Sequence, residues 1–283
     1  NQSIEVEAGV ILETIHEFVD KRNFLYPLSM ASKGTCCIGG NLATNAGGIG
    51  VLKYGNARDL CLGLEVVLAD GSIINDIKTL KKDNTGYDLK NLFIGSEGSL
   101  GIITRAVLRL YPTPTNKFVV FFGVRDFNAA LKSYLEISKR FGQFLQAFEL
   151  ISDVGMLFLE ETKMFRSNVE RSKSDWHVLI ELGFNTRSVE DEVYETLNNL
   201  FKENIVSDVV VGDTEAKARN LWKIREDIPE ANRKIGAITS HDISLPLENM
   251  ESFINKSLIE IKEINKLLRV NCFGHMGDGN LHF

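Results

Sequence analysis

Apolar residues recur every three to four positions in four stretches of this sequence, the spacing of one face of an α-helix. The predicted helices are Ile11–Arg22, Phe127–Phe141, Val189–Glu203 and Pro246–Leu267. The predicted apolar face of the second helix consists of Phe127, Leu131, Tyr134 and Leu135. Pro246 stands near the first turn of the last helix, where a missing backbone N–H costs nothing.

Short runs of apolar residues predict five strands. They are Leu64–Ala69, Ile102–Leu110, Phe118–Val124, His177–Leu182 and Asp208–Val211. Asp70-Gly71 follows the first strand and is a typical hairpin dipeptide. The stretch Gly34–Gly55 is so rich in glycine that we expect an ordered loop system without helix or strand.

Tyr111–Lys117 contains two of the five prolines and predicts a linker, so we expect domains at 1–114 and 115–283. After it, strands and helices alternate in the order strand, helix, strand, helix, strand. This order predicts an α+β fold, in which two split βαβ units form an antiparallel sheet.

Composition narrows the class of protein. The chain has 283 residues and a formal net charge of -6, and no basic stripe suggests a nucleic-acid partner. No apolar run approaches the roughly 20 residues of a membrane span, and no signal peptide opens the chain. The four cysteines lack CxxC spacing, which indicates a reducing compartment such as the cytoplasm or the mitochondrial matrix.

Two glycine-rich segments, Ile38–Gly48 and Gly95–Thr104, are candidates for ligand binding. Glycines allow a backbone to approach a ligand closely, and the N–H groups of such turns bind anions. The alternative is a pair of tight turns or β-bulges at sheet corners. Two such segments in one short domain favour a cofactor, although neither has the spacing of a dinucleotide fingerprint or a P-loop.

The segment "GHMGDGNLHF" carries two of the five histidines, His275 and His282. Both can ligate one zinc or similar divalent ion if the intervening GDGN folds as a turn. The alternative is one exposed histidine and one core histidine. We expect Asp278 to form the turn or to support a ligating residue rather than to bind the metal itself, because Asp-Gly pairs so often form turns.

Two long segments carry a resemblance to a known family. "KGTCCIGGNLATNAGGIGVLKYGNARDLCLGLEVVLADGSI" and "KDNTGYDLKNLFIGSEGSLGIITRAVLRLYPTP" resemble the FAD-linked oxidases of the vanillyl-alcohol-oxidase type. Within them the chain is similar to the group of D-2-hydroxyglutarate dehydrogenases, D-lactate dehydrogenases and glycolate oxidases. "LWKIRE", "HDISLP" and the closing "GHMGDGNLHF" fit the same group.

The resemblance implies a partial FAD-binding domain followed by a substrate domain with an antiparallel sheet. The residues it implies for FAD are Gly39, Gly40, Asn41, Thr44, Asn45, Gly48, Gly98, Gly101 and Ile103. It implies that Arg225 clamps the substrate carboxylate, since a planar guanidinium binds a carboxylate bidentately. The alternative for Arg225 is a surface arginine paired with Glu226 or Asp227. It implies that His275 and His282 hold the metal.

The implied reaction is oxidation of a D-2-hydroxy acid to the 2-oxo acid, with hydride transfer to FAD. The expected partners are the acid, an electron acceptor (a quinone or an electron-transfer protein) and, in a homodimer, a second copy. The alternatives are an inactive fragment that keeps the fold and part of its ligand binding, and a metal-binding module without redox chemistry. Ser240 stands where hydroxyglutarate-type members of the group usually have lysine, and Pro229 stands where they have threonine. These two differences predict a weaker preference for acids with a second carboxylate, such as hydroxyglutarate.

The family pattern also extends beyond both ends of this sequence. It begins with a lobe that holds the FAD pyrophosphate, and it continues to a Ser-Ala-Glu-His-Gly segment with a third metal ligand and a base. We therefore expect a fragment that binds FAD and metal weakly.

Overall fold

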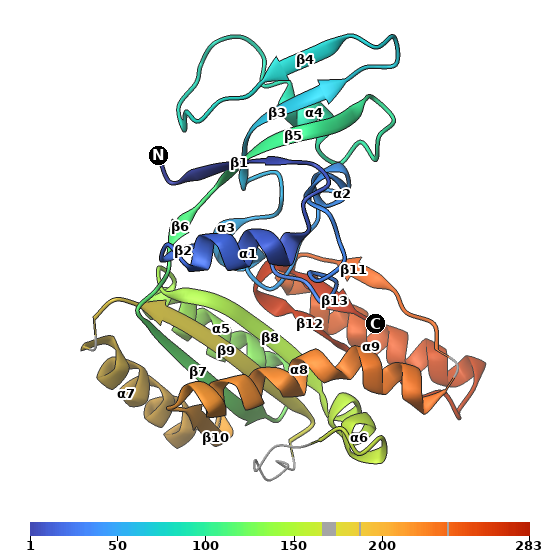
Figure 1. Ribbon diagram of the computed structural model, residues 1–283. Helices are drawn as coiled ribbons and strands as arrows, with labels where there is room; N and C mark the ends of the chain where they lie inside the picture. The colour runs from blue at the N-terminus through green and yellow to red at the C-terminus, as the bar shows by residue number, and fades with distance from the viewer. Residues whose placement is uncertain (166–173, 187, 237) are drawn as a thin grey trace. The chain divides into compact units, whose positions relative to one another are not determined.

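The structure is a computed structural model that describes residues 1–165, 174–186, 188–236 and 238–283. The chain divides into two compact units, Asn1–Thr113 and Pro114–Phe283 (Figure 1). Each unit has its own sheets, and each is described below by itself.

Unit 1 contains a small antiparallel sheet in the order β1-β5-β3-β4, a separate β2-β6 pair and four helices. The strands are β1 (Ser3–Glu7), β2 (Phe24–Leu25), β3 (Cys61–Val67), β4 (Ile73–Asp76), β5 (Ile102–Arg109) and β6 (Tyr111–Pro112). The helices are α1 (Leu12–Asp20), α2 (Ile38–Ala43), α3 (Val51–Tyr54) and α4 (Lys90–Phe93). Asp70-Gly71 lies in the turn between β3 and β4, as the sequence predicted, and Gly71 has a φ of +84°.

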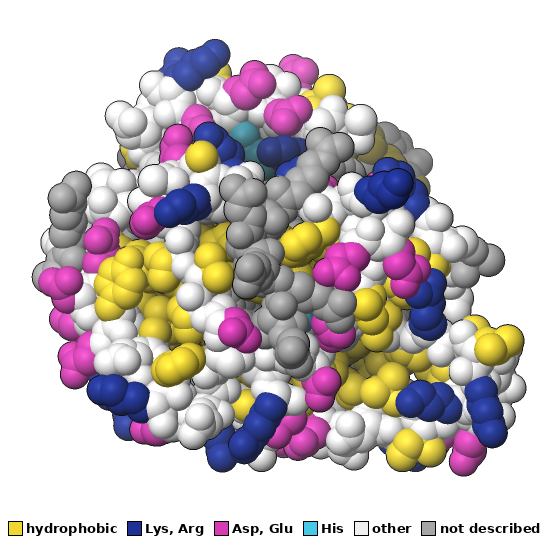
Figure 2. All heavy atoms as spheres, turned by 90° about the horizontal axis from the view of Figure 1, so that it is seen from below, with side chains coloured by type: hydrophobic (Ala, Val, Ile, Leu, Met, Phe, Trp, Pro, Cys, Tyr) yellow, Lys and Arg dark blue, Asp and Glu magenta, His cyan; other side chains and the backbone are white. Residues whose placement is uncertain are grey.

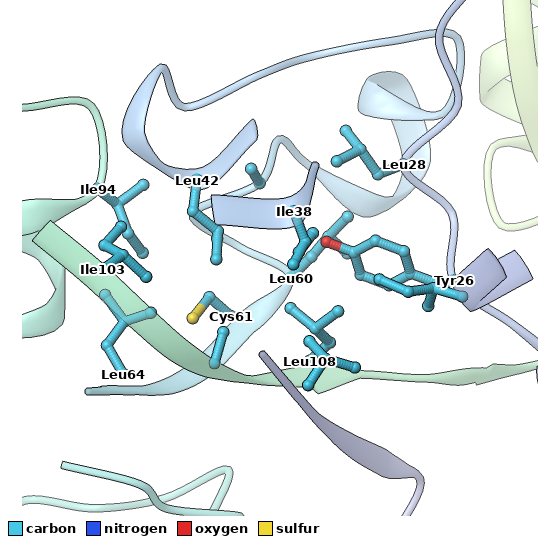
Figure 3. Packing of buried hydrophobic residues seen from close by; sticks show 14 of the residues in the cluster. Tyr26, Leu28, Ile38, Leu42, Leu60, Cys61, Leu64, Ile94, Ile103 and Leu108 are labelled. Atoms are coloured by element: carbon cyan, nitrogen blue, oxygen red, sulfur yellow. The ribbon is translucent and has the colours of Figure 1, made fainter. Parts of the chain in front are cut away.

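The core of unit 1 fixes the two glycine-rich segments against the sheet. Ile38 and Leu42 of α2 are fully buried and belong to one cluster with Leu64 of β3, Ile94 and Ile103 (Figure 3). Apolar burial of this kind contributes roughly 1.5–3 kcal/mol per large side chain. The same core therefore holds both glycine-rich segments, Ile38–Gly48 and Gly95–Thr104.

The prediction of a loop without helix over Gly34–Gly55 was wrong, because the stretch contains α2 and α3. A Cβ atom on Gly39 would lie 2.6 Å from the Cβ of Ala8. Here glycine permits a short helix to pack closely on the chain after β1. Close packing thus outweighs the low helix propensity of glycine.

Unit 2 is built on a seven-stranded antiparallel sheet in the order β10-β7-β9-β8-β12-β13-β11. The strands are β7 (Asn116–Val124), β8 (Leu145–Ser152), β9 (Trp176–Phe184), β10 (Ser207–Gly212), β11 (Asp242–Ser244), β12 (Phe273–His275) and β13 (Asn280–His282). The helices are α5 (Phe127–Phe141), α6 (Asp153–Glu161), α7 (Ser188–Lys202), α8 (Glu215–Ile235) and α9 (Leu247–Ile264), with a 3₁₀ turn, η1, over Met276–Asp278.

The first four strands confirm the predicted α+β fold. Their order, β10-β7-β9-β8, with α5 and α7 as the crossovers, is that of two split βαβ units. Contacts of Tyr134 with Phe148 and of Tyr194 with Phe118 place α5 and α7 on one face of the sheet. The other face forms an apolar cluster with α6 and α8.

The four helices predicted from periodicity are present as α1, α5, α7 and α9. The predicted apolar face of α5 was wrong at Leu135, which is 55% exposed. The helix instead buries Phe127, Ala130, Ser133, Ile137 and Phe141, so small residues share the face that meets the sheet. Among the elements of unit 2 with eight or more residues, β8, α6 and the 21-residue α8 were not predicted.

None of the helices in the described part of the chain is long and apolar enough to cross a membrane. Figure 2 shows one face of the molecule on which Lys and Arg are interspersed with Asp and Glu. This face therefore presents no field of a single sign.

Candidate functional site

Strands β8, β12, β13 and β11 are neighbours in the sheet of unit 2 (Figure 1), and their register brings the predicted histidines to one place. His275 of β12 lies directly opposite Glu149 of β8. His282 of β13 lies opposite Phe273 of β12 on one side and opposite Asp242 of β11 on the other. Because directly opposed residues of an antiparallel pair point to the same face, all five side chains share one face of the sheet.

Glu149 lies at the centre of this group and is completely buried. Its Oε2 atom accepts a hydrogen bond of 2.8 Å from Nε of Arg225. Its Oε1 atom lies 2.6 Å from Nδ1 of His275. Each oxygen of one buried carboxylate thus holds a different predicted site residue.

The charge of Glu149 is maintained by its two partners. Burial raises the pKa of the Glu149 carboxyl, but the positive charge of Arg225 and the contact with His275 outweigh it, so the pKa lies below its ordinary value. Burial likewise lowers the pKa of His275, and the neighbouring Glu149 carboxylate more than reverses this. A buried anion of this kind is stable only with such partners.

Arg225 reaches the group from α8 and is only 7% exposed. Its guanidinium carbon lies 4.6 Å from the ring centroid of Phe273, which is cation–π geometry. The alternative of a surface arginine paired with Glu226 or Asp227 is therefore wrong. Among the described residues, no hydrogen bond engages either Nη nitrogen of Arg225.

The two imidazole rings lie beside each other, as the sequence predicted. Their centroids are 5.6 Å apart and their planes meet at 80°. Nδ1 of His282 lies 3.2 Å from Oδ1 of Asp242. Burial, followed by the charge of Arg225, lowers the pKa of His282 below its ordinary value, which favours the neutral ring.

The GDGN sequence forms the tight turn that this arrangement needs. η1 is followed by Gly279, whose φ of +84° is in the left-handed region that glycine favours. A Cβ at Gly279 would also collide with the carbonyl oxygen of Leu245. Asp278 accepts a hydrogen bond from the backbone N–H of Asn280 at 3.1 Å, which closes the turn.

The donor set has part of what a metal requires. Both histidines direct Nδ1 to a carboxylate, which is how ligating imidazoles are usually oriented, and this leaves Nε2 for the ion. Zinc sites normally have at least three protein ligands. Within the ranges that the structure describes, no group of three or more His, Cys, Asp or Glu side chains is arranged to hold a metal.

In unit 1 the two glycine-rich segments are joined directly. The N–H of Gly95 donates to Leu42 and the N–H of Glu97 donates to Ala43, at 3.0 and 2.9 Å. Arg58 adds a bond of 2.6 Å from Nη2 to the carbonyl of Ile94. The segments that were predicted to line FAD therefore form one continuous surface.

The predicted FAD glycines differ in what lies beside them. At Gly39, Gly48 and Gly101 the space for a Cβ is taken by Ala8, Ser29 and Val66. At Gly40 there is nothing within 4 Å, so a ligand can approach this backbone. Gly98 has a φ of +79° and a near neighbour only in Ile102.

Three predicted polar residues are already engaged inside unit 1. Thr44 donates its hydroxyl to the carbonyl of Gly40 at 2.9 Å, and the side-chain oxygen of Asn45 accepts from the N–H of Arg58. Asn41 is 5% exposed and donates to the sulfur of Met30. Ile103 is 9% exposed and belongs to the core.

Three residues in these regions escaped the sequence-based reasoning: Ser96, Glu149 and Asp242. The Ser96 hydroxyl is buried without a hydrogen-bond partner in the described part of the protein, as expected where a ligand completes the bonding. Glu149 had a signal, because it is the one charged residue in the apolar run "LQAFELIS". For Asp242 and Ser96 the sequence gives no indication of a role beyond their positions in "HDISLP" and in Gly95–Thr104.

Comparison with known proteins gives matches along both units. Residues 113–283 match the family described as FAD linked oxidases, C-terminal domain, and residues 1–76 match the family described as FAD binding domain. The chain is 39% identical to the mitochondrial D-2-hydroxyglutarate dehydrogenase of Arabidopsis thaliana, over 98% of this chain and 49% of that protein. It is 39% identical to the same-named protein of Bos taurus, over 98% and 50%.

The chain thus spans about half the length of the curated relatives it matches. A solved structure of alkyldihydroxyacetonephosphate synthase superimposes with a TM-score of 0.74 at 15% identity, over 99% of this chain and 57% of that one. At this identity the likeness concerns the fold alone.

Proposed function

The chain belongs to the FAD-linked oxidases, and on this premise we propose that it serves the FAD-dependent oxidation of a D-2-hydroxy acid to the 2-oxo acid. The acid is of the hydroxyglutarate or lactate type. The observation that carries the proposal is the convergence of Arg225, His275 and His282 around the buried Glu149. When bound, FAD supplies the acceptor for the hydride that leaves C2 of the acid.

Arg225 binds the carboxylate of the substrate in this proposal. Its Nε is committed to Glu149, so the two Nη groups are the donors left for a carboxylate. The contact with Phe273 keeps the guanidinium plane in one orientation. The substrate carboxylate would thereby be bound next to the histidine pair.

His275 and His282 would hold a zinc or similar divalent ion through Nε2. The chemistry that such an ion would supply is that of a Lewis acid towards the substrate hydroxyl. Two imidazoles alone bind a metal weakly, and oxygen atoms of water or substrate would complete its coordination.

FAD would be held in unit 1 by the joined surface of the two glycine-rich segments. The open backbone at Gly40 and the unpartnered hydroxyl of Ser96 fit a ligand there. Gly39, Gly48 and Gly101 serve that surface indirectly, because they allow its segments to pack closely.

For the location and the electron acceptor, the proposal is based on the relatives and on the family resemblance. Their names place them in mitochondria, so we propose the mitochondrial matrix for this protein, with a quinone or an electron-transfer protein as the electron acceptor. A homodimer stays a prediction from the resemblance.

The test is an anaerobic titration of the purified protein with FAD, followed by D-2-hydroxyglutarate or D-lactate. We expect the visible flavin absorption to be perturbed on binding and bleached by the acid. Because Ser240 and Pro229 replace two polar residues of the group, we expect no strong preference for hydroxyglutarate over lactate. FAD binding without bleaching by any D-2-hydroxy acid would favour the inactive alternative, and no FAD binding would contradict the proposal.

A further inference from the structure

We propose that Glu149 is a positioning residue that holds Arg225 and His275 together and makes Nδ1 the proton-bearing nitrogen of His275. In consequence, the Nη groups of Arg225 and the Nε2 atom of His275 face the same site with fixed geometry. The catalytic part of this inference rests on the proposed function. The geometric part does not.

The contacts support a shared role for the two carboxylate oxygens. Oε2 receives Nε of Arg225 at 2.8 Å, and Oε1 receives Nδ1 of His275 at 2.6 Å. With Glu149 at 0% exposure, water cannot replace either partner. A rotation of the carboxylate would break both hydrogen bonds at once, so the two site residues are coupled through one side chain.

The chemistry of a carboxylate decides the tautomer. An ionised carboxylate only accepts hydrogen bonds, so the nitrogen of His275 that faces it must carry the proton. Nε of Arg225, 2.8 Å from the other carboxylate oxygen, is the cationic partner that a buried carboxylate needs in order to stay ionised. In the neutral ring, Nε2 then has a free lone pair, the form in which imidazole binds a metal.

A purely structural role can be separated from this one, because the sheet has a second glutamate in contact with α8. Glu181 of β9 accepts a hydrogen bond of 2.6 Å from the indole Nε1 of Trp222. Trp222 precedes Arg225 by three positions on the same helix. Glu181 thus also links α8 to the sheet, but it touches neither Arg225 nor a histidine among the contacts of the described residues.

The experiment compares Glu149→Gln and Glu149→Asp with Glu181→Gln as the matched control, all in the full chain. Glutamine keeps the size of the side chain, but only one of its two terminal atoms accepts hydrogen bonds, because the other is an NH2 donor. Aspartate keeps the charge and is one methylene too short to reach both. Imidazole nitrogens are observed by ¹⁵N NMR at a pH where the rings are neutral, and Zn²⁺ affinity is measured by competition with a chromogenic chelator.

In the unsubstituted protein we expect His275 to carry its proton on Nδ1. In Glu149→Gln we expect the Nε2-protonated form to gain population and Zn²⁺ affinity to fall about 10–100-fold, the usual effect of losing a carboxylate behind a ligating histidine. Glu149→Asp should not restore the affinity, and Glu181→Gln should leave it within about twofold, far below that range.

Two results would overturn the inference. One is an Nε2-protonated His275 in the unsubstituted protein, a measurement that needs no variant to fold. The other is an equal loss of Zn²⁺ affinity in Glu149→Gln and Glu181→Gln, which would reduce Glu149 to a link between helix and sheet. Failure of D-2-hydroxy acids to bleach the flavin would contradict the proposed function and leave the tautomer result intact.

Discussion

At the scale of single residues, the buried pair of Arg225 and Glu149 dominates unit 2. Arg225 is 7% exposed and Glu149 is not exposed, so neither charge is compensated by water. A buried ion pair adds little net stability over apolar side chains of the same volume. Removal of one partner, however, would leave an uncompensated buried charge, so disruption of the pair should be costly.

We expect Arg225→Ala to lower the free energy of unfolding by about 3–5 kcal/mol, because Glu149 would be left as an uncompensated buried charge. Urea unfolding measures this. Arg233→Ala is the matched control on the same helix, since Arg233 is exposed and, within the described ranges, its ion pair is with the half-buried Glu230. It should change the free energy by no more than about 0.5 kcal/mol. Equal effects of both variants would show that Arg225 is not buried as described.

The Glu149–His275 contact predicts a pH dependence with a defined sign. The pKa of Glu149 is lowered from 4.5, so its contribution to stability is present above pH 4.5 and lost as pH falls through the folded-state pKa. The pKa of His275 is raised from 6.5, so its contribution is present below pH 6.5 and lost as pH rises through the folded-state pKa. Both contributions are complete between these two values.

The difference in free energy of unfolding between the unsubstituted protein and Glu149→Gln should therefore be largest between pH 4.5 and 6.5. Urea titrations of both proteins across the pH range measure this difference. A difference that does not vary with pH would contradict the ion pair.

At the scale of elements, the glycines in and after helix α2 have two different roles. One leaves open space beside the backbone, and the other allows close packing. Gly40 has open space at the Cβ position, whereas a Cβ at Gly48, just beyond the helix, would collide with the carbonyl oxygen of Ser29. Gly48 is thus needed for the fold. Gly40 is not, which makes it the informative position for the ligand.

We expect Gly40→Ala to stabilise the protein by about 0.5–1 kcal/mol, because alanine loses less conformational entropy in a helix. The same variant should bind FAD more weakly, because its methyl group would occupy the space left for the ligand. Thermal unfolding and a flavin fluorescence titration measure the two effects. Gly9→Ala is the control, since Gly9 is equally open but lies outside the predicted FAD segments. Unchanged FAD affinity in Gly40→Ala would remove Gly40 from the site.

Local periodicity made some elements predictable and left others hidden. α5 and α7 have one apolar face each, so their bounds follow from the sequence almost residue for residue. β8 is buried along its whole length and shows no alternation, and β12 and β13 have three residues each. Such strands are defined by their neighbours in the sheet, which local sequence does not report.

The residues of the candidate site likewise fall into those that the sequence predicted and one that it did not. Arg225, His275 and His282 could be named because they stand in recognisable motifs. Glu149 is separated from Arg225 by 76 positions and from His275 by 126. Only the register of β8 and β12 brings it to them, so its role needed the structure.

At the scale of the whole molecule, the chain consists of two units with separate cores, Asn1–Thr113 and Pro114–Phe283. The chain has two tryptophans, Trp176 and Trp222, and both belong to unit 2. Tryptophan fluorescence therefore reports on unit 2, whereas far-ultraviolet circular dichroism reports on both units. The two probes can show whether the units unfold together.

We expect the units to respond separately to substitutions in their own cores, because each buries its own apolar cluster. Arg225→Ala should lower the urea midpoint measured by tryptophan fluorescence. Gly48→Ala, which forces the backbone near Ser29 to move, should cost about 1–3 kcal/mol in unit 1 and change the circular dichroism transition while the fluorescence midpoint stays in place. Gly71→Ala would be a poor control, since its positive φ adds strain, and Gly9→Ala serves instead. If Gly48→Ala moved the fluorescence midpoint as far as Arg225→Ala does, the two units would form one cooperative structure, and substitutions in the glycine-rich segments could no longer be interpreted without reference to the histidine pair.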